Sequence, residues 1–313
     1  FEDLGYQKPL FFPEPFAVYQ YFRSVEKKIK ISNDGRALTT LVVDFGGGTF
    51  DCCVIRTNKT GELGRGGAQQ RPLGSQSIEL AGEALDLALL ELVTEKAKKE
   101  EGIKFKENPV ERAQQGTAQA MWIIEDAKIS LSGQISKIPS DSNESAFAQC
   151  THRVNLPAGT FHHDLDVSVQ LTGVDLEREI RKLWLKEWGQ VVIDCHKSAN
   201  EKLNEEITEY DYVLIAGGSA QLPFLENLLR QTLRNQTGRS TIITGGQAGE
   251  TVAKGIAIEC MEQADKHPSL VTNRLVNSLE SDLHILVGKN KTDQKPVKIK
   301  SSNYVEKNSS GLI

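Results

Sequence analysis

Residues 41–55 read LVVDFGGGTFDCCVI, and the rest of the chain is interpreted from this stretch. Two runs rich in β-branched residues flank a turn of three glycines and a threonine, which predicts a hairpin. Because glycine has no Cβ, successive N–H groups in such a turn can converge on one anion, and phosphate is the natural candidate. The element after the turn is a strand and no Gly-Lys-Ser or Gly-Lys-Thr follows, so the turn is not a Walker loop.

Two carboxylates, Asp44 and Asp51, stand at the ends of this turn, and Thr49 adds a hydroxyl group. Acidic side chains beside a phosphate site indicate a cation between them, and Mg²⁺ held through water suits ligands that are all oxygen. A Gly-Gly-Gly turn alone is more often an ordinary tight turn. The whole octet DFGGGTFD is much more specific.

The composition is that of a soluble globular protein with one large core or two modest ones. The chain has 313 residues, of which 39% are hydrophobic and 25% charged, and its net charge is −5. This negative net charge argues against non-specific electrostatic binding to nucleic acid or anionic lipid. No apolar stretch approaches the roughly 18 residues that span a bilayer, and Phe1 opens no signal peptide. We expect a cytoplasmic protein without nucleic-acid or membrane partners, and a fragment of a longer chain because it lacks an initiator methionine.

The cysteines predict free thiols. There are five, an odd number, and no two form a Cys-x-x-Cys pair: Cys52, Cys53, Cys150, Cys195 and Cys260. Cys52 and Cys53 are neighbours in a strand, so they face opposite sides and cannot share a metal. Zinc at Cys150, His152 and His162-His163 is a disfavoured alternative, because no second pair with finger spacing accompanies them.

Hydrophobic periodicity and turn signals predict an alternation of helices and strands. A helix follows Pro13-Glu14-Pro15 over 16–29, and a mobile loop covers 64–77. The other predicted elements are helices from 81, over 110–131, from 174, from Pro223 and over 250–263, a hairpin around Val154 and 167–171, and strands at 212–216, 242–243, 283–287 and 297–299.

Two further motifs carry chemistry. Glu125, Lys128 and Ser132 fall within about 60° of one another on a helix, so they project from one face. Taken alone, they would more simply be a solvent-facing ion pair with a neighbouring serine. The segment AGGSAQLP at 216–223 joins a buried strand to a helix through two glycines, which lets a ligand approach the backbone closely.

Together with Glu14-Pro15 and the octet, these motifs resemble, in order, those of the seventy-kilodalton heat-shock (DnaK-like) chaperones of the actin and hexokinase ATPase superfamily. The resemblance runs from Phe1 to about Gln263. It implies an α/β chain with the actin-like (ribonuclease H-like) ATPase fold, mostly lobe II. The expected division is 1–36, the end of lobe I and the crossing helix; 37–265, lobe II with a clamp subdomain at about 80–170; and 266–313, a linker and the start of a β domain.

The resemblance also implies roles for individual residues. The catalytic residues would be Glu14, Asp44, Thr49 and Asp51, with Glu14 orienting the attacking water and the two aspartates holding hydrated Mg²⁺. The cofactor, ATP or ADP, would be bound by Gly46, Gly47, Gly48, Thr49, Gly82, Glu83, Glu125, Lys128, Ser132, Gly217, Gly218, Ser219 and Gln221. Nucleotide-driven lobe closure would control the C-terminal region, and a client protein or co-chaperone would be a possible partner.

The chain departs from the family pattern at several positions. Gln221 replaces an arginine that usually stacks on adenine, Gly249 stands where an acidic residue is common, and Ala81 replaces a glycine. The first phosphate loop would precede Phe1, so we expect ATP hydrolysis only by the intact protein. This chain alone should bind nucleotide weakly and hydrolyse it at no measurable rate. Two alternatives stay open: a small-molecule kinase of the same superfamily, and a pseudo-ATPase scaffold that keeps the motifs as structure.

Overall fold

The computed structural model describes residues 13–30, 36–57, 72–100, 102–105, 108–114, 118–138, 144–158, 166–245 and 250–266, and four short strands between 277 and 305. Among these residues, no helix is both long enough and apolar enough to cross a membrane. Gly249 and His162-His163, which the sequence singled out, lie outside the described residues.

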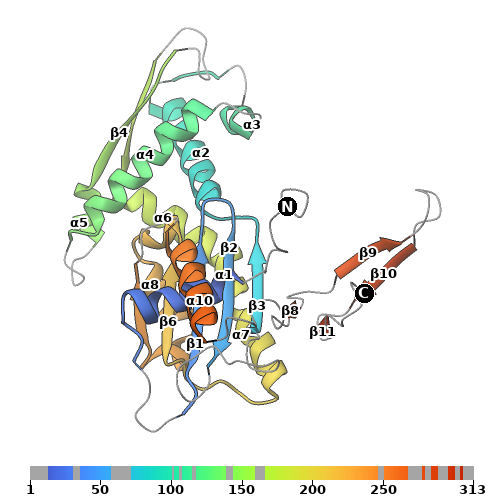
Figure 1. The fold of residues 1–313 in the computed structure, drawn as a ribbon. Coiled ribbons are helices and arrows are strands. Elements are labelled where there is room, and N and C mark those ends of the chain that lie inside the picture. Colours follow the sequence, from blue (N-terminus) through green and yellow to red (C-terminus); the bar gives the residue numbers. More distant parts are fainter. Residues whose placement is uncertain are drawn as a thin grey trace.

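A five-stranded sheet in the order β3-β2-β1-β6-β7 forms the centre of the fold (Figure 1). Its strands are β1 (Thr39–Phe45), β2 (Phe50–Arg56), β3 (Pro72–Ile78), β6 (Tyr212–Ala216) and β7 (Thr241–Thr244). β2 is antiparallel to both β1 and β3, whereas β6 runs parallel to both β1 and β7. The hairpin predicted around the glycine turn and the strand predicted at 212–216 are therefore confirmed.

β3 corrects the sequence prediction of a loop over 64–77. Residues 72–77 belong to a strand, and the part of the predicted loop before them lies outside the described residues. Gly74 explains the error: a Cβ there would lie 2.2 Å from the carbonyl oxygen of Cys195 and 2.8 Å from the nitrogen of Ala199. Both belong to α7 (Gly189–Leu203), so this glycine allows the strand to pack directly on a helix.

Helices cover both faces of the sheet. On one face α1 (Glu14–Gln20) and α10 (Thr251–Lys266) lie side by side (Figure 1), and Val42 and Cys53 contribute to the core beneath them. On the other face α7 packs against β2 and β3, and Cys52 belongs to that larger core. The opposite orientations predicted for Cys52 and Cys53 are confirmed, because side chains alternate along a strand.

The helix predicted over 16–29 begins at Glu14 and ends earlier than expected. α1 stops at Gln20, and a π-helical turn continues to Val25. Pro13 precedes the first turn, where the missing N–H of a proline removes no helical hydrogen bond.

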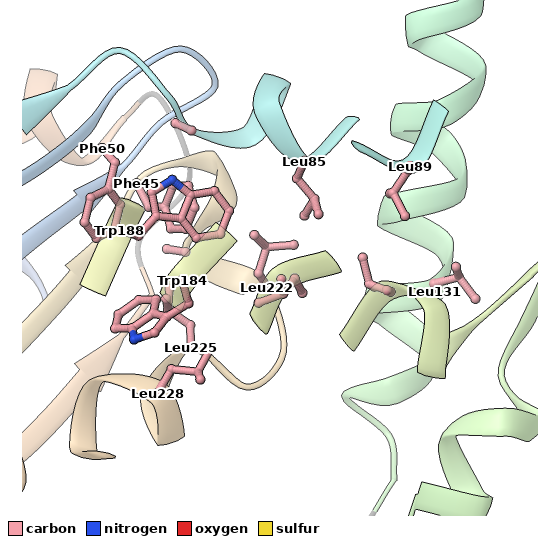
Figure 2. Packing of buried hydrophobic residues seen from close by; sticks show 14 of the residues in the cluster. Phe45, Phe50, Leu85, Leu89, Leu131, Trp184, Trp188, Leu222, Leu225 and Leu228 are labelled. Atoms are coloured by element: carbon pink, nitrogen blue, oxygen red, sulfur yellow. The ribbon is translucent and has the colours of Figure 1, made fainter. Parts of the chain in front are cut away.

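The helix predicted from Val174 is interrupted in the same way. α6 (Gly173–Leu183) starts at a capping box between Thr172 and Asp175, and a π-helical turn from Trp184 to Trp188 separates it from α7. The ring of Trp188 lies edge-on to Phe45 with centroids 4.7 Å apart, and its Nε1 donates to the carbonyl oxygen of Leu80 at 2.7 Å. Figure 2 shows this aromatic cluster beside leucines of the neighbouring helices, with which it forms one continuous core.

The described elements between residues 82 and 172 form a second group beyond one end of the sheet, at the top of Figure 1. Its elements are α2 (Gly82–Glu100), α3 (Pro109–Gln114), α4 (Ala118–Ile135), α5 (Glu144–Gln149) and a hairpin of β4 (Thr151–Leu156) and β5 (Val167–Thr172). The hairpin prediction is confirmed. The helix predicted over 110–131, with a soft break at Gly116, is present as α3 and α4, and residues 115–117 between them lie outside the described residues. The predicted domain boundaries stay a prediction.

The C-terminal elements begin with a 3₁₀ turn at Gly218–Gln221 that follows β6. α8 (Leu225–Thr232) starts two residues after Pro223, the predicted helix start, and α9 (Arg234–Thr237) follows it. β9 (Leu283–Val287) pairs with β10 (Lys295–Ile299), and β8 (Asn277–Ser278) pairs with β11 (Tyr304–Val305). The strands predicted at 283–287 and 297–299 are thus present.

We expect the native protein to contain no disulfide and to protect its buried thiols. Cys52, Cys53, Cys150 and Cys195 are free and buried, and burial raises the pKa of the Cys195 thiol to about 12. Because the thiolate is the reactive species, alkylation of these residues should be at least about tenfold slower in the native than in the unfolded protein. Peptide mass mapping measures this, with urea-unfolded protein as the control. A reproducible disulfide under native conditions would contradict the prediction.

Candidate functional site

The glycine turn between β1 and β2 contacts the first turn of α2. The N–H of Gly82 donates to the carbonyl oxygen of Gly46 at 3.3 Å, and the N–H of Glu83 donates to that of Gly47 at 2.8 Å. The N–H of Gly46 closes the turn by donating to the carbonyl oxygen of Thr49 at 2.9 Å. The turn therefore holds the start of α2 with its carbonyl groups, while its tip, which includes Gly48, stays exposed.

The turn after β6 packs against the same place. Gly217 has a φ of +93°, and a Cβ there would lie 2.4 Å from the carbonyl oxygen of Phe45 and 2.6 Å from Oδ1 of Asp44. The hydroxyl of Ser219 donates to the carbonyl oxygen of Gly46 at 2.9 Å. Three glycine-containing segments that are far apart in the sequence thus meet at one point, and at Gly217 both the backbone conformation and the close approach exclude a side chain.

Three carboxylates gather beside this junction. Asp44 and Asp51 are directly opposite each other in the β1–β2 pair. Burial, followed by the negative charges of Glu14 and Asp51, raises the pKa of Asp44 to about 6. Glu14 comes from α1, so the fold brings together the acidic residues that the sequence proposed for catalysis. Such a cluster is destabilised by mutual repulsion until a cation neutralises it.

The carboxylates of Asp44 and Asp51 offer only oxygen ligands, which suit Mg²⁺ held through its waters. Within the described ranges, no group of three or more His, Cys, Asp or Glu side chains has the geometry to hold a metal directly. The described residues give no support to the zinc alternative at Cys150 and His152, and His162-His163 lie outside them.

A pocket of about 1180 Å³ opens next to the junction. Its walls are α2, α4 and the turn after β6. Of the residues predicted to bind the cofactor, those that line it are Gly47, Gly82, Glu83, Glu125, Lys128, Ser132, Gly218, Ser219 and Gln221. The other predicted site residues do not line the pocket. They are Glu14, Asp44, Gly46, Gly48, Thr49, Asp51 and Gly217. The latter group belongs to the glycine turn, the carboxylate cluster and the glycine that packs against β1.

An ion pair that sequence reasoning missed lies on the pocket wall. Nζ of Lys128 donates to Oδ2 of Asp86 at 2.9 Å, and both residues are buried. The solvent-facing pair with Glu125, considered as the simpler explanation of Lys128, is therefore wrong. Burial raises the pKa of Asp86 to about 6, although Lys128 acts in the opposite direction. Asp86 lies four residues after Gly82 and therefore on the same face of the helix. This spacing is the sequence signal that could have predicted Asp86 as a pocket residue.

Two buried polar atoms among the pocket-lining residues have no hydrogen-bond partner in the described part of the chain. They are Oδ1 of Asp86 and the hydroxyl oxygen of Ser132. A buried polar group left without a partner costs about 1–3 kcal/mol, so such groups are usually satisfied in the functional state. Both atoms fit a ligand that offers hydroxyl or amino groups.

The charge of the pocket favours one part of a nucleotide over another. The charged residues that line it are three acids, Glu83, Asp86 and Glu125, and one base, Lys128, which is already paired. Such a wall repels phosphate and attracts hydroxyl and amino donors. The sugar and base of a nucleotide suit the pocket, whereas its phosphates suit the exposed glycine turn.

Apolar side chains complete the lining of the pocket, and none of them was among the predicted site residues. They are Leu87, Met121, Trp122, Ile129 and Leu222. Trp122 and Ile129 are exposed by 71% and 60% of their surface.

The comparisons with known proteins agree with this geometry. The family model described as "Hsp70 protein" matches residues 30–271, well over half of the chain. The chain belongs to the Hsp70 family. The resemblance inferred from the four motifs is thus confirmed, and the actin-like ATPase fold follows from membership of this family.

Two of the proteins that this chain resembles are named chaperone protein DnaK. The chaperone protein DnaK of Thermosipho melanesiensis is 26% identical over 234 residues, which cover 73% of this chain and 33% of DnaK. The chaperone protein DnaK of a Thermus thermophilus strain is 26% identical over 225 residues, which cover 71% of this chain and 31% of that protein. The matched region therefore spans about a third of the length of these relatives.

Proposed function

We propose that this Hsp70-family chain binds an adenine nucleotide, ATP or ADP, with its nucleoside in the pocket between α2 and α4. The observation that carries the proposal is the convergence of motifs from three distant segments on one pocket. The residues that line the same space are Gly82 and Glu83, then Glu125, Lys128 and Ser132, and finally Gly218, Ser219 and Gln221. A well-formed pocket on which a few polar groups converge is the usual form of a small-molecule binding site.

The nucleoside would be held by groups that accept hydrogen bonds. Glu125 is exposed on the pocket face of α4 and would accept from the ribose hydroxyls. The hydroxyl of Ser132 and Oδ1 of Asp86 would gain partners that the described chain does not provide. Gly82 and Gly218 would let the backbone lie close to the ligand.

The phosphates would lie at the exposed tip formed by Gly47, Gly48 and Thr49, where backbone N–H groups and a hydroxyl are available. Asp44 and Asp51 would hold hydrated Mg²⁺, which supplies positive charge against the phosphates. Glu14 would orient a water for attack, since its charge already acts on Asp44. The protein would contribute position and charge stabilisation, as phosphoryl transfer generally requires.

In the whole protein, ATP would close the two lobes and its hydrolysis would release them. This cycle would control a C-terminal region, with a client protein or co-chaperone as a possible partner. The relatives are named chaperone protein DnaK, which supports this part of the proposal. A cytoplasmic location, proposed from the composition, likewise stays a prediction.

Calorimetric titration of the chain with ADP and Mg²⁺ tests the proposal through Glu125→Ala. We expect this substitution to weaken ADP binding by roughly tenfold to a hundredfold, because a hydrogen bond to a charged group contributes about 1.5–3 kcal/mol. Asp126→Ala is the matched control: it removes the same charge one residue away, from a side chain that is 77% exposed and does not line the pocket. Its affinity should stay within about twofold. No binding by the unmodified chain, or equal losses in both variants, would refute the proposal.

A further inference from the structure

A buried histidine outside the pocket joins α7 to the segment that leads into β6. His196 of α7 is 8% exposed and does not line the pocket. Its Nδ1 lies 2.8 Å from the hydroxyl oxygen of Tyr210, and its Nε2 lies 3.2 Å from Nδ2 of Asn200. Both ring nitrogens therefore have partners inside the protein. We call His196, Asn200 and Tyr210 the histidine cluster.

The amide group of Asn200 determines which nitrogen of His196 carries the hydrogen. Oδ1 of Asn200 accepts a hydrogen bond from the N–H of Ile207 at 2.9 Å, so its Nδ2 faces the imidazole ring. An amide NH₂ group can only donate, and Nε2 of His196 must therefore accept. Nδ1 then carries the hydrogen and donates to the hydroxyl of Tyr210. The cluster fits one neutral tautomer, because a second proton on Nε2 would point at the NH₂ group of Asn200.

The side of the cluster next to the sheet is fixed, whereas the other side can yield. Tyr210 is fully buried, its N–H donates to the carbonyl oxygen of Gln236 at 2.8 Å, and its own carbonyl oxygen accepts from the hydroxyl of Ser240 at 2.6 Å. Residues 204–209, which connect α7 to this point, are exposed except for Ile207. Exposed connecting segments with few buried contacts are the parts of a protein that open locally at low cost.

An acidic side chain on this segment offers a second place for a protonated imidazole. Burial lowers the pKa of His196, and the negative charge of Glu206 acts in the opposite direction. Glu206 is exposed and belongs to the segment that can yield. Other titratable groups around α7 are the thiols of Cys52 and Cys195, the phenol of Tyr210, the ion pairs Arg56–Glu205, Asp194–Lys197, Lys186–Glu187 and Glu226–Arg230, and the side chains of Asp51, Glu201, Lys202 and Glu209, while β3 has none.

We propose that the histidine cluster is an acid-sensitive latch, which holds residues 204–209 against α7 while His196 is neutral and releases them when His196 is protonated. In the released state the imidazolium leaves Asn200 and Tyr210 and pairs with Glu206. Asn200 then no longer holds the N–H of Ile207. The proton comes from solvent and no covalent bond changes. The latch does not depend on the proposed nucleotide site.

The pH range of the release follows from the direction of the pKa shift. The pKa of His196 is lowered in the folded protein, so the stability that this group contributes is complete above the ordinary imidazole pKa of about 6.5 and is lost as the pH falls below it. This dependence is opposite to that of Asp44, whose raised pKa favours the folded state at low pH. A variant of His196 is therefore needed to separate the two.

Amide hydrogen exchange of the full chain, corrected for the intrinsic pH dependence of exchange, tests the latch at Ile207. Between about pH 7.5 and about pH 5.5, the protection of this amide should fall by about fivefold to tenfold, because an opened imidazole with a pKa of about 6.5 takes up a proton in this range. His196→Gln keeps a polar side chain that cannot become charged, so it should abolish the fall. His152→Gln is the matched control and should leave the fall unchanged, since His152 belongs to β4 and lies beside Asp126.

Nitrogen-15 resonances of the His196 ring provide a test that does not require this residue to be replaced. We expect the tautomer with hydrogen on Nδ1 at about pH 7.5 and a titration midpoint below about pH 6.5. Glu206→Gln, at an exposed side chain, should lower this midpoint and reduce the loss of Ile207 protection at about pH 5.5 by about twofold. Three results would overturn the latch: hydrogen on Nε2, a midpoint at or above about pH 6.5, or an equal loss of Ile207 protection in folded His196→Gln.

Discussion

Replacing Gly217 with alanine is expected to lower the free energy of unfolding by about 2–5 kcal/mol, the sum of a backbone cost and a packing cost. The residue has a φ of +93°, which costs a residue with a side chain roughly 1–2 kcal/mol. Its new Cβ would lie 2.4 Å from the carbonyl oxygen of Phe45, and overpacking of this kind costs typically about 1–3 kcal/mol. Phe45 ends β1, which is held between β2 and β6 and cannot move aside.

Urea denaturation measures this loss, and Gly47→Ala is the control. A Cβ at Gly47 meets nothing within 4 Å, so this variant should unfold within about 0.5 kcal/mol of the unmodified chain. The comparison separates the effect of the close approach from that of removing any glycine. Equal stability of the two variants would show that the turn after β6 does not pack against β1 as described.

Replacing Asp44 with asparagine is expected to stabilise the protein when Mg²⁺ is absent. The pKa of Asp44 is raised from 3.8 to about 6, so the native state binds the proton more tightly than the unfolded state. Stability from this group is greatest below about pH 4 and is lost as the pH rises through about 6. At about pH 7.5 the charge is destabilising, and its removal should add about 1–2 kcal/mol after allowance for solvent screening. Thermal unfolding from about pH 4 to pH 8 measures the gain, which should vanish near pH 4.

The same substitution is expected to suppress Mg²⁺-dependent ATP turnover by the intact protein by about 10²–10³-fold, if the proposed function holds. Asparagine keeps the shape of the side chain but lacks the charge that holds the hydrated ion, and electrostatic contributions of this kind reach that size. Phosphate release measures turnover, and Asp126→Asn, at a side chain that is 77% exposed and is not among the charges that act on Asp44, should change it little. A stable variant whose turnover falls less than about threefold would place Asp44 away from the metal.

Local patterns in the sequence were sufficient for much of the architecture. The hairpin around residues 46–49 follows from β-branched runs on either side of glycines, and the strand at 212–216 from a short apolar run that ends in glycines. The shared face of Glu125, Lys128 and Ser132 follows from helical spacing alone, and all three line the pocket. These features depend on neighbours within a few residues, so they can be predicted without the tertiary structure.

Other features depend on partners that are distant in the sequence, and only the tertiary structure decided them. Gly74 resembles a loop residue until α7 packs on it, more than a hundred residues later. Lys128 pairs with Asp86, which lies 42 residues earlier in the sequence. Only Oδ2 of Asp86 takes part in this pair, and Oδ1 has no partner in the described chain. The exposure of Trp122 on a pocket wall likewise cannot be predicted from hydrophobic periodicity. Periodicity predicts which face of a helix a residue occupies, but not what lies opposite that face.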